Sequence, residues 1–382
     1  MKIKKFVPVI LTSVFVSLHF GALLYITSAF LAEFFSPLGV SVLFVLGALG
    51  NIVFFFLAPQ LLRKVGKKLL LVFFLSASAL SSLGMAFSHT RVEAASYFLI
   101  YGSVFFLVYY CLDLFLEELS SDRRTGEIRG FYASLFNAGI MGGPLFSTFL
   151  SAEDSLEMVY VIGALLLVIP LIFSIFIIKS HKSSRHGNVP LFLPFRAWWK
   201  QRDIRAVTLA KLSLEIFFSF MVVYTPIYLH DILAFGWAEL GVIFTVMLIP
   251  FVILEWPIGE LSDRLWGEKE IMSIGFFIIG LAVLVMPFID KSFWGWMFIL
   301  FFSRVGASLV EITTDIYFFK KISANDDELL SIFRLMRPLS MGLAAGAGAI
   351  LLSHFSFVSI FFVTAIVVFI GMREALYLKD TR

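Results

Sequence analysis

The chain has 382 residues, of which 60% are hydrophobic and 15% charged, and its formal net charge is +3. A composition this apolar excludes an ordinary water-soluble protein and is typical of a chain that crosses a membrane many times. Cys111 is the single cysteine, so no intrachain disulfide forms and cysteine usage indicates no compartment.

Twelve apolar runs are long enough to cross a hydrocarbon core of about 30 Å. The first follows MKIKKF, lacks a clear cleavage site and is followed by similar runs, so we interpret it as a span rather than a signal peptide. The pattern predicts an all-α polytopic membrane protein. Its spans cover residues 7–30, 39–62, 69–88, 95–118, 131–151, 156–178, 205–230, 237–259, 271–289, 293–319, 331–352 and 355–372.

The basic residues are distributed unevenly between the two sides of these spans. With a cytoplasmic N-terminus, 26 of the 30 Lys and Arg lie inside when helix-edge residues are counted there, and Arg91 and Lys291 lie outside. Lys211 and Arg304 fall within spans. Positive charge favours the cytoplasmic side, so we expect a multi-pass protein of the cell (inner or plasma) membrane with both termini cytoplasmic.

The longest loop divides the spans six and six. We expect an N-terminal six-helix bundle at 1–178, a cytoplasmic linker at 179–203 and a C-terminal six-helix bundle at 204–382. Within the linker, Trp198 and Trp199 have basic flanks. This composition suits an interfacial helix on the inner leaflet, and a plain tether is equally compatible with it.

Three matches at an offset of about 200 residues indicate an internal repeat. Tyr25 corresponds to Tyr224, Gly66 to Gly267 and Asp113 to Asp315. Two six-span halves related by such a repeat are the plan of a transporter whose binding site lies between them.

Span ten carries charge inside an apolar run. Arg304, Ser308, Glu311 and Asp315 fall within an arc of about 60° and form a stripe about 16 Å tall. Each ionised group at the bilayer centre costs at least about 2.5 kcal/mol, so the stripe must face other helices or a wet cavity. Pairing between Arg304 and Glu311 within the helix is an alternative or additional role.

Further polar residues in spans are candidates to line that cavity. In span four, Asp113 is pseudo-equivalent to the acids of span ten, and a desolvated carboxylate there is suited to proton loading and release near neutral pH. Lys211 and Glu215, one turn apart, are expected to neutralise each other, with binding of an anionic substrate by Lys211 as the alternative. The other candidates for substrate or coupling-ion contact are His19, Tyr25, Asn51, Asn137 and Tyr224, with packing or interhelical hydrogen bonding as the alternative.

Two loops resemble a known signature. Gly259, Asp263, Arg264 and Gly267 follow the pattern G-x-x-x-D-R-x-G-x-K of the major facilitator superfamily, with one residue inserted before the second Gly. The first-half copy keeps Lys64 and Gly66 but has Arg63 in place of the aspartate. The resemblance implies the major facilitator fold, with twelve helices in two pseudo-symmetric bundles, and a gating role for these loops.

Span five resembles the antiporter motif of drug-exporting members of that superfamily. Gly130, Gly139, Gly143 and Pro144 match its spacing G-x8-G-x3-G-P, while Ser147 and Thr148 replace its last two glycines. The exporter pattern also expects an arginine in span four, and the nearest analogue here is Arg304 in span ten. Ordinary close packing of a Gly-rich helix explains the same residues.

The cytoplasmic loops suggest a latch. Pseudo-symmetry places basic loop 63–68 near acidic loop 325–328, and Asp263 near Arg123, Arg124 and Arg129. Exposed pairs contribute only about 0–1 kcal/mol each, so several would act together to close the inside.

These features predict a secondary transporter that works by alternating access, with proton-coupled export of a small molecule as the leading reading. The alternatives are an uptake permease for a sugar, amino acid or other metabolite, and a membrane-embedded enzyme. The enzyme reading rests on the spacing of Asp113 with Glu117 and of Glu311 with Asp315, which superficially resembles the acidic pairs of prenyltransferases. We expect a monomer in the lipid bilayer that is not an enzyme, with no cofactor, bound metal or nucleic-acid partner, since nucleotide-binding and metal-spaced motifs are missing from the sequence.

Overall fold

A computed structural model describes residues 3–24, 26–119, 125–150, 156–176, 193–264, 266–322 and 327–379. Within these ranges the chain is helical and contains no β-strand. The long helices are α1 (Ile3–Leu24), α3 (Pro37–Val65), α4 (Lys67–Ala86), α5 (Arg91–Leu119), α6 (Thr125–Leu150), α7 (Leu156–Phe176), α9 (Arg202–Ile227), α10 (Trp237–Arg264), α11 (Glu268–Val285), α12 (Phe293–Lys321), α13 (Asp327–His354) and α14 (Ser359–Leu376). The short ones are α2 (Thr27–Phe34), α8 (Leu193–Lys200), the π-turn η3 (Tyr228–Ile232) and the 3-10 turn η4 (Met286–Phe288).

Eleven of the long helices are long and apolar enough to cross a membrane, judged on the described residues alone. The remaining long helix, α6, has 26 residues and lies against both α1 and α10. The prediction of an all-α protein with twelve transmembrane helices in two six-helix bundles is confirmed. The first predicted span, 7–30, is interrupted, because α1 ends at Leu24 and α2 begins at Thr27.

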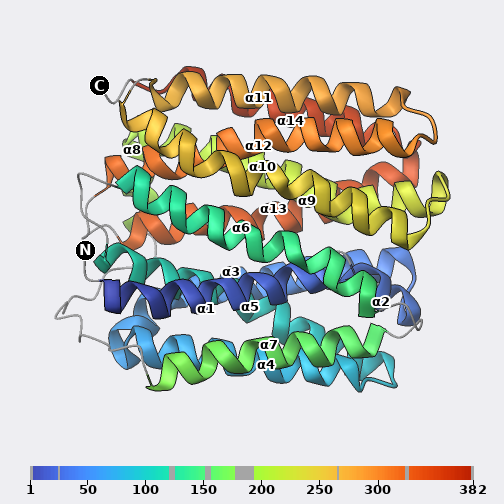
Figure 1. Ribbon diagram of the computed structural model, residues 1–382, viewed down its shortest axis with the longest axis horizontal. Helices are drawn as coiled ribbons and strands as arrows, with labels where there is room; N and C mark the ends of the chain where they lie inside the picture. Colours follow the sequence, from blue (N-terminus) through green and yellow to red (C-terminus); the bar gives the residue numbers. More distant parts are fainter. Residues whose placement is uncertain are drawn as a thin grey trace.

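The two groups of six helices lie side by side (Figure 1). Helices α4 and α7 lie at one flank and α11 and α14 at the other, while α6, α10, α3 and α13 lie between them. The first group contacts the second mainly where α6 packs on α10 and α3 packs on α13. Helix α1 begins and α14 ends at the same end of the bundle, which we call the terminal end.

Local sequence sets several helix boundaries. Ser36 and Ser292 accept hydrogen bonds from Gly39 and Gly295, which caps the starts of α3 and α12. Gly66 joins α3 to α4 with φ +81° and ψ 156°, a backbone conformation essentially restricted to glycine. The chain therefore reverses direction there within a single residue.

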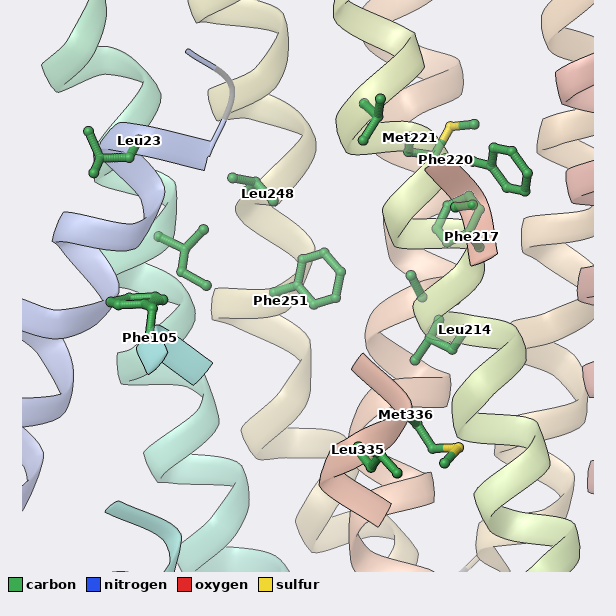
Figure 2. Close-up of a cluster of buried hydrophobic side chains, with 14 of the residues drawn as sticks. Leu23, Phe105, Leu214, Phe217, Phe220, Met221, Leu248, Phe251, Leu335 and Met336 are labelled. Atoms are coloured by element: carbon green, nitrogen blue, oxygen red, sulfur yellow. The ribbon is translucent and has the colours of Figure 1, made fainter. Parts of the chain in front are cut away.

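Buried apolar side chains fill the space inside and between the halves. Figure 2 shows Phe217 and Phe220 of α9 pointing into this core, with Leu248 and Phe251 of α10 and Phe105 of α5 belonging to the same cluster. Apolar side chains also cover outward positions of the long helices; Leu80 and Phe298 are 68% and 65% exposed. In a bilayer such positions would contact lipid.

The division into 1–178, 179–203 and 204–382 stays a prediction. Of the linker, residues 193–203 belong to the described part, and they contain α8. Arg205 donates to the Trp199 carbonyl over 2.9 Å and lies over its ring at 5.1 Å, so α8 is tied to the start of α9.

Candidate functional site

Charged side chains from four helices meet between the two halves near the terminal end. With a rise of about 1.5 Å per residue, Asp113 and Asp315 lie about 9 Å from the terminal ends of α5 and α12. We call this set the ionic layer. It consists of Asp113 on α5, Lys211 and Glu215 on α9, Glu311 and Asp315 on α12, and Arg334 and Arg337 on α13.

Arg334 connects the two halves. Its Nε lies 2.8 Å from Asp113 Oδ2 on the N-terminal side, and its Nη2 lies 3.1 Å from Asp315 Oδ2 on its own side. Asp113 and Asp315 are the residues that the internal repeat relates to each other. One guanidinium is therefore shared by a pseudo-symmetric pair of carboxylates.

Lys211 lies among three carboxylates. Its Nζ is 3.3 Å from Asp315, 3.6 Å from Glu215 and 3.9 Å from Glu311. Glu215 also binds Arg337 Nε at 3.2 Å. The expected neutralisation of Lys211 by Glu215 is thus one contact within a larger network.

The network is buried enough for pairing to matter. Lys211, Glu215 and Asp113 are 3%, 4% and 6% exposed. Removing one partner of a buried ion pair costs about 3–5 kcal/mol, because the other charge is left in a medium that solvates it poorly. The charged groups of the ionic layer therefore depend on one another, because removal of one leaves its partner poorly solvated.

A further carboxylate lies where α6 meets α10. Glu255 on α10 has no exposed surface, and its Oε2 and Oε1 accept hydrogen bonds from Asn137 Nδ2 at 2.9 and 3.0 Å. Within the described residues, no Lys or Arg lies within ion-pair distance of Glu255. The contact joins the N-terminal and C-terminal halves a second time, through a neutral donor.

Arg304 lies farther along α12 from the terminal end than Glu311 and Asp315. The residue is 2% exposed, and its guanidinium lies over the rings of Phe217 and Phe218, at 4.9 and 5.7 Å from their centroids. The stripe predicted on this helix therefore faces other helices, with its acidic end at Lys211 and its basic end on aromatic rings.

Adjoining cavities border these groups. One of about 640 Å³, including its opening, is bordered by Asp113, Asn137, Glu255, Glu311 and Arg334. The next, of about 650 Å³, shares Asn137 and Glu311 with it. A third, of about 640 Å³, is mostly apolar and runs between α1, α3 and α5, with Asn51 and Thr27 among its polar side chains. Each cavity shares lining residues with the next, and charged side chains in the lining give way to apolar and aromatic ones along the three.

Three predicted candidates lie away from the ionic layer. His19 donates from Nδ1 to the Gly163 carbonyl at 2.8 Å and accepts at Nε2 from the Tyr101 hydroxyl at 2.9 Å, all within the N-terminal half. Asn51 donates to the Ser103 carbonyl at 2.8 Å, and Tyr224 donates to the Ala345 carbonyl at 3.3 Å. Tyr25 lies outside the described residues.

The structure does not describe the side chains of several predicted gating residues. They are Arg63, Asp263, Arg264 and Pro144, together with the proposed latch partners at 123–129 and 325–328. Lys64 is exposed, and Gly259 is buried and accepts a hydrogen bond from the Ser262 hydroxyl. The loop latch stays a prediction.

The glycines of α6 lie at close helix crossings. A Cβ on Gly130 would lie 2.9 Å from the Glu255 carbonyl oxygen on α10, and one on Gly139 would lie 2.8 Å from the Val14 carbonyl oxygen on α1. At Gly143 a Cβ would overlap the backbone of Gly21. These positions let α6 approach a helix of each half.

We expect Gly143→Ala to destabilise the protein by about 1–3 kcal/mol, because the added methyl group forces α1 and α6 apart. Gly142→Ala is the matched control, since its Cβ would meet only the flexible end of Leu18 at 3.2 Å. Thermal unfolding of both variants in detergent measures the difference. Equal midpoints would mean that α1 and α6 are not in close contact at Gly143.

Sequence reasoning missed part of the ionic layer. Arg334 and Arg337 were counted as helix-edge residues on the cytoplasmic side, but the structure places their guanidinium groups on Asp113, Asp315 and Glu215 between the halves. The signal was present, because both arginines fall inside span 331–352, where a charge needs a partner. Glu255 in span 237–259 carries the same signal.

Comparison with known proteins gives a partial sequence match and a complete structural one. A sequence model described as Major Facilitator Superfamily matches residues 234–382. The crystal structure of the human organic anion transporter MFSD10 (TETRAN) aligns with a TM-score of 0.76 at 15% identity, over 97% of this chain and 99% of that one. The crystal structure of a mutant of the nucleoside transporter NupG aligns with a TM-score of 0.75 at 13% identity, over 97% and 98%. Among curated protein sequences there is no match. At these identities the structural likeness concerns the fold alone.

Proposed function

We propose that this protein, which has the fold of the major facilitator superfamily and matches that superfamily's sequence model in its C-terminal part, is a secondary transporter that works by alternating access. The resemblance deduced from the loop signature is confirmed. The observation that carries the mechanism is the Arg334 guanidinium, which binds carboxylates of both halves beside a central cavity.

Alternating access requires contacts between the halves that break without leaving a buried charge alone. When the halves separate at the terminal end, Arg334 loses Asp113 but keeps Asp315, which lies on its own side. Asp113 then meets the water that enters the opening. The desolvation cost that makes buried pairs hard to break is thereby small for this one. We infer that the Asp113–Arg334 pair closes the terminal end.

The coupling ion proposed is the proton, and the proposed direction is export. The ionic layer holds four carboxylates against three basic groups, and Glu255 adds a fifth carboxylate. A carboxylate in excess of the basic groups is available to exchange a proton with water that enters the cavity. Opposed movement of protons and substrate through one cavity would drive export, whereas uptake of a sugar, amino acid or other metabolite is the alternative.

We also propose a cell-membrane location, an orientation and an oligomeric state for the protein, from its charge distribution and its fold. The excess of Lys and Arg toward the terminal end supports a cytoplasmic location for it in a cell membrane. A monomer suffices, because the cavity is formed by helices of one chain. An enzymatic role for the acid pairs is not favoured, because Asp113, Glu311 and Asp315 are engaged by Arg334 and Lys211.

Flux in proteoliposomes tests this function. We expect a pH gradient across the membrane, imposed in one direction or the other, to drive accumulation of one class among organic cations, sugars and amino acids. A protonophore should abolish that accumulation. Protein-free liposomes are the control. Accumulation that ignores the pH gradient would reject proton coupling, and absence of flux for every class in a protein that binds one of them would reject transport.

A further inference from the structure

The charge available to a ligand in the central cavity is negative. Four carboxylates border its charged part, against two guanidinium groups. The two guanidinium groups already hold carboxylates, since Arg334 binds Asp113 and Asp315 and Arg337 binds Glu215. A ligand anion would have to displace one of these bonds and leave a carboxylate uncompensated.

Glu255 and Glu311 are the carboxylates least compensated by cations. Glu255 is bound by the neutral amide of Asn137, and the nearest cation to Glu311 is Lys211 at 3.9 Å. The Glu311 side chain is 23% exposed, so it presents charge to the cavity directly. A cation placed between these two groups gains attraction and disrupts no existing ion pair.

Aromatic rings line the same part of the cavity. Tyr109 lies edge-on to Phe136 with ring centroids 5.0 Å apart, and Tyr132 stacks on Phe136 at 6.3 Å. The faces of such rings attract organic cations, each contributing about 0.5–2 kcal/mol depending on desolvation. The Tyr109 hydroxyl is buried and has no hydrogen-bond partner in the described part of the chain.

The wall continues into the adjoining cavity, where apolar side chains predominate and stand beside Glu215, Glu311, Arg304 and Arg337. The adjoining cavity is bordered by Phe20, Phe106, Phe218 and Phe251 as well as by Glu311. A ligand with a charged group at Glu255 and Glu311 therefore meets rings along the rest of its length. Sites of this kind select for an apolar body with a few fixed polar contacts.

We propose that the substrates are amphipathic organic cations, and that Glu255, held by Asn137 at the seam between α6 and α10, is the anchor for their positive charge together with Glu311. This inference rests on the proposed transport function and names its substrate class. A proton on Glu255 neutralises the same anchor, so proton and substrate compete for it.

Tetraphenylphosphonium and tetraphenylborate test which ligand charge the site prefers, because the two ions share shape and size and differ in charge. We expect saturable binding of tetraphenylphosphonium to the purified protein, above the level of empty micelles. Tetraphenylborate should compete at least about tenfold more weakly, the equivalent of about 1.4 kcal/mol. Binding of tetraphenylphosphonium should weaken as the pH falls.

Variants of Glu255 test the anchor. Glu255→Gln keeps the shape of the side chain and leaves no Lys or Arg of the described chain without a partner. We expect this variant to bind tetraphenylphosphonium about tenfold more weakly and without dependence on pH. Glu255→Asp, which keeps the charge, should retain most of the affinity. Glu270→Gln on the exposed face of α11 is the control and should bind like the parent protein.

The outcomes separate this inference from the transport function. Preferential binding of tetraphenylborate, or equal binding by the Glu255→Gln and parent proteins, would overturn the cation site. Flux of a sugar or amino acid without any tetraphenylphosphonium binding would overturn the substrate class and leave transport standing. Binding of tetraphenylphosphonium without flux of it or of any other class tested would support the site and reject transport.

Discussion

Arg334→Gln is expected to abolish most transport, lowering flux about 100-fold or more, and to destabilise the protein by about 2–4 kcal/mol. The substitution leaves Asp113 and Asp315 buried without the guanidinium that both bind. The lower end of that range reflects the 20% exposure of the Arg334 side chain, which lets water replace part of the lost interaction. Flux in proteoliposomes and thermal unfolding in detergent measure the two effects.

The controls separate the loss of this contact from the loss of charge in general. Arg373→Gln removes an exposed arginine from α14 and should transport like the parent protein. The exchange Asp113→Arg with Arg334→Asp again places two carboxylates around one guanidinium, so part of the flux should return. Full activity of Arg334→Gln would remove the cross-half ion pair from the mechanism.

Lys211→Gln is expected to have the largest effect on stability. Its ammonium group is 3% exposed and lies within 4 Å of Glu215, Glu311 and Asp315. Without it, the buried carboxylate of Glu215 and the partly buried ones of Glu311 and Asp315 repel one another, and we expect a loss of about 3–5 kcal/mol at pH 8. A proton taken up anywhere in this group of like charges lowers the repulsion, so the loss should shrink as the pH falls toward 5.

Thermal unfolding midpoints at pH 5 and pH 8 test this dependence. Lys211→Arg keeps the positive charge and should stay close to the parent protein at both pH values. Lys200→Gln, on the exposed surface of α8, should show no pH-dependent loss. A Lys211→Gln protein that is equally destabilised at both pH values would show that charge repulsion is not the cause.

The fold was predictable because membrane spans leave a strong linear signal. A run of about 20 apolar residues is readable without knowing its neighbours, and an even number of runs puts both termini at one end. The shorter α2 was missed because hydropathy continues through the break between Leu24 and Thr27. Such a break depends on backbone conformation, which the average over a window does not record.

The ionic layer was only half predictable for a different reason. The cost of burying charge identified Asp113, Glu311 and Asp315 as groups that need a partner. Arg334, the partner of Asp113 and Asp315, is 221 positions from Asp113 along the chain, and the meeting of the two depends on helix rotation about the axis. Glu255 was not predicted as a site residue. Its hydrogen-bond donor, Asn137, lies 118 positions away along the chain, so the sequence alone does not show that the two side chains meet.

The Asp113–Arg334 contact also differs in kind from the predicted loop latch. A pair in the loops is exposed and contributes about 0–1 kcal/mol, whereas the ionic layer is largely screened from water. A few buried pairs are therefore enough to hold the terminal end closed. The loop pairs, whose side chains lie mostly outside the described residues, stay a second, separate prediction.

Two distances between spin labels test the central claim that the Asp113–Arg334 pair closes the terminal end. In a Cys111→Ala background, cysteines replace the exposed residues Lys64 and Lys321 at the terminal end, and Val92 and Phe288 at the opposite end. We predict that Asp113→Asn lengthens the Lys64–Lys321 distance and shortens the Val92–Phe288 distance in lipid. Distance distributions identical to those of the parent protein at both ends would contradict the account.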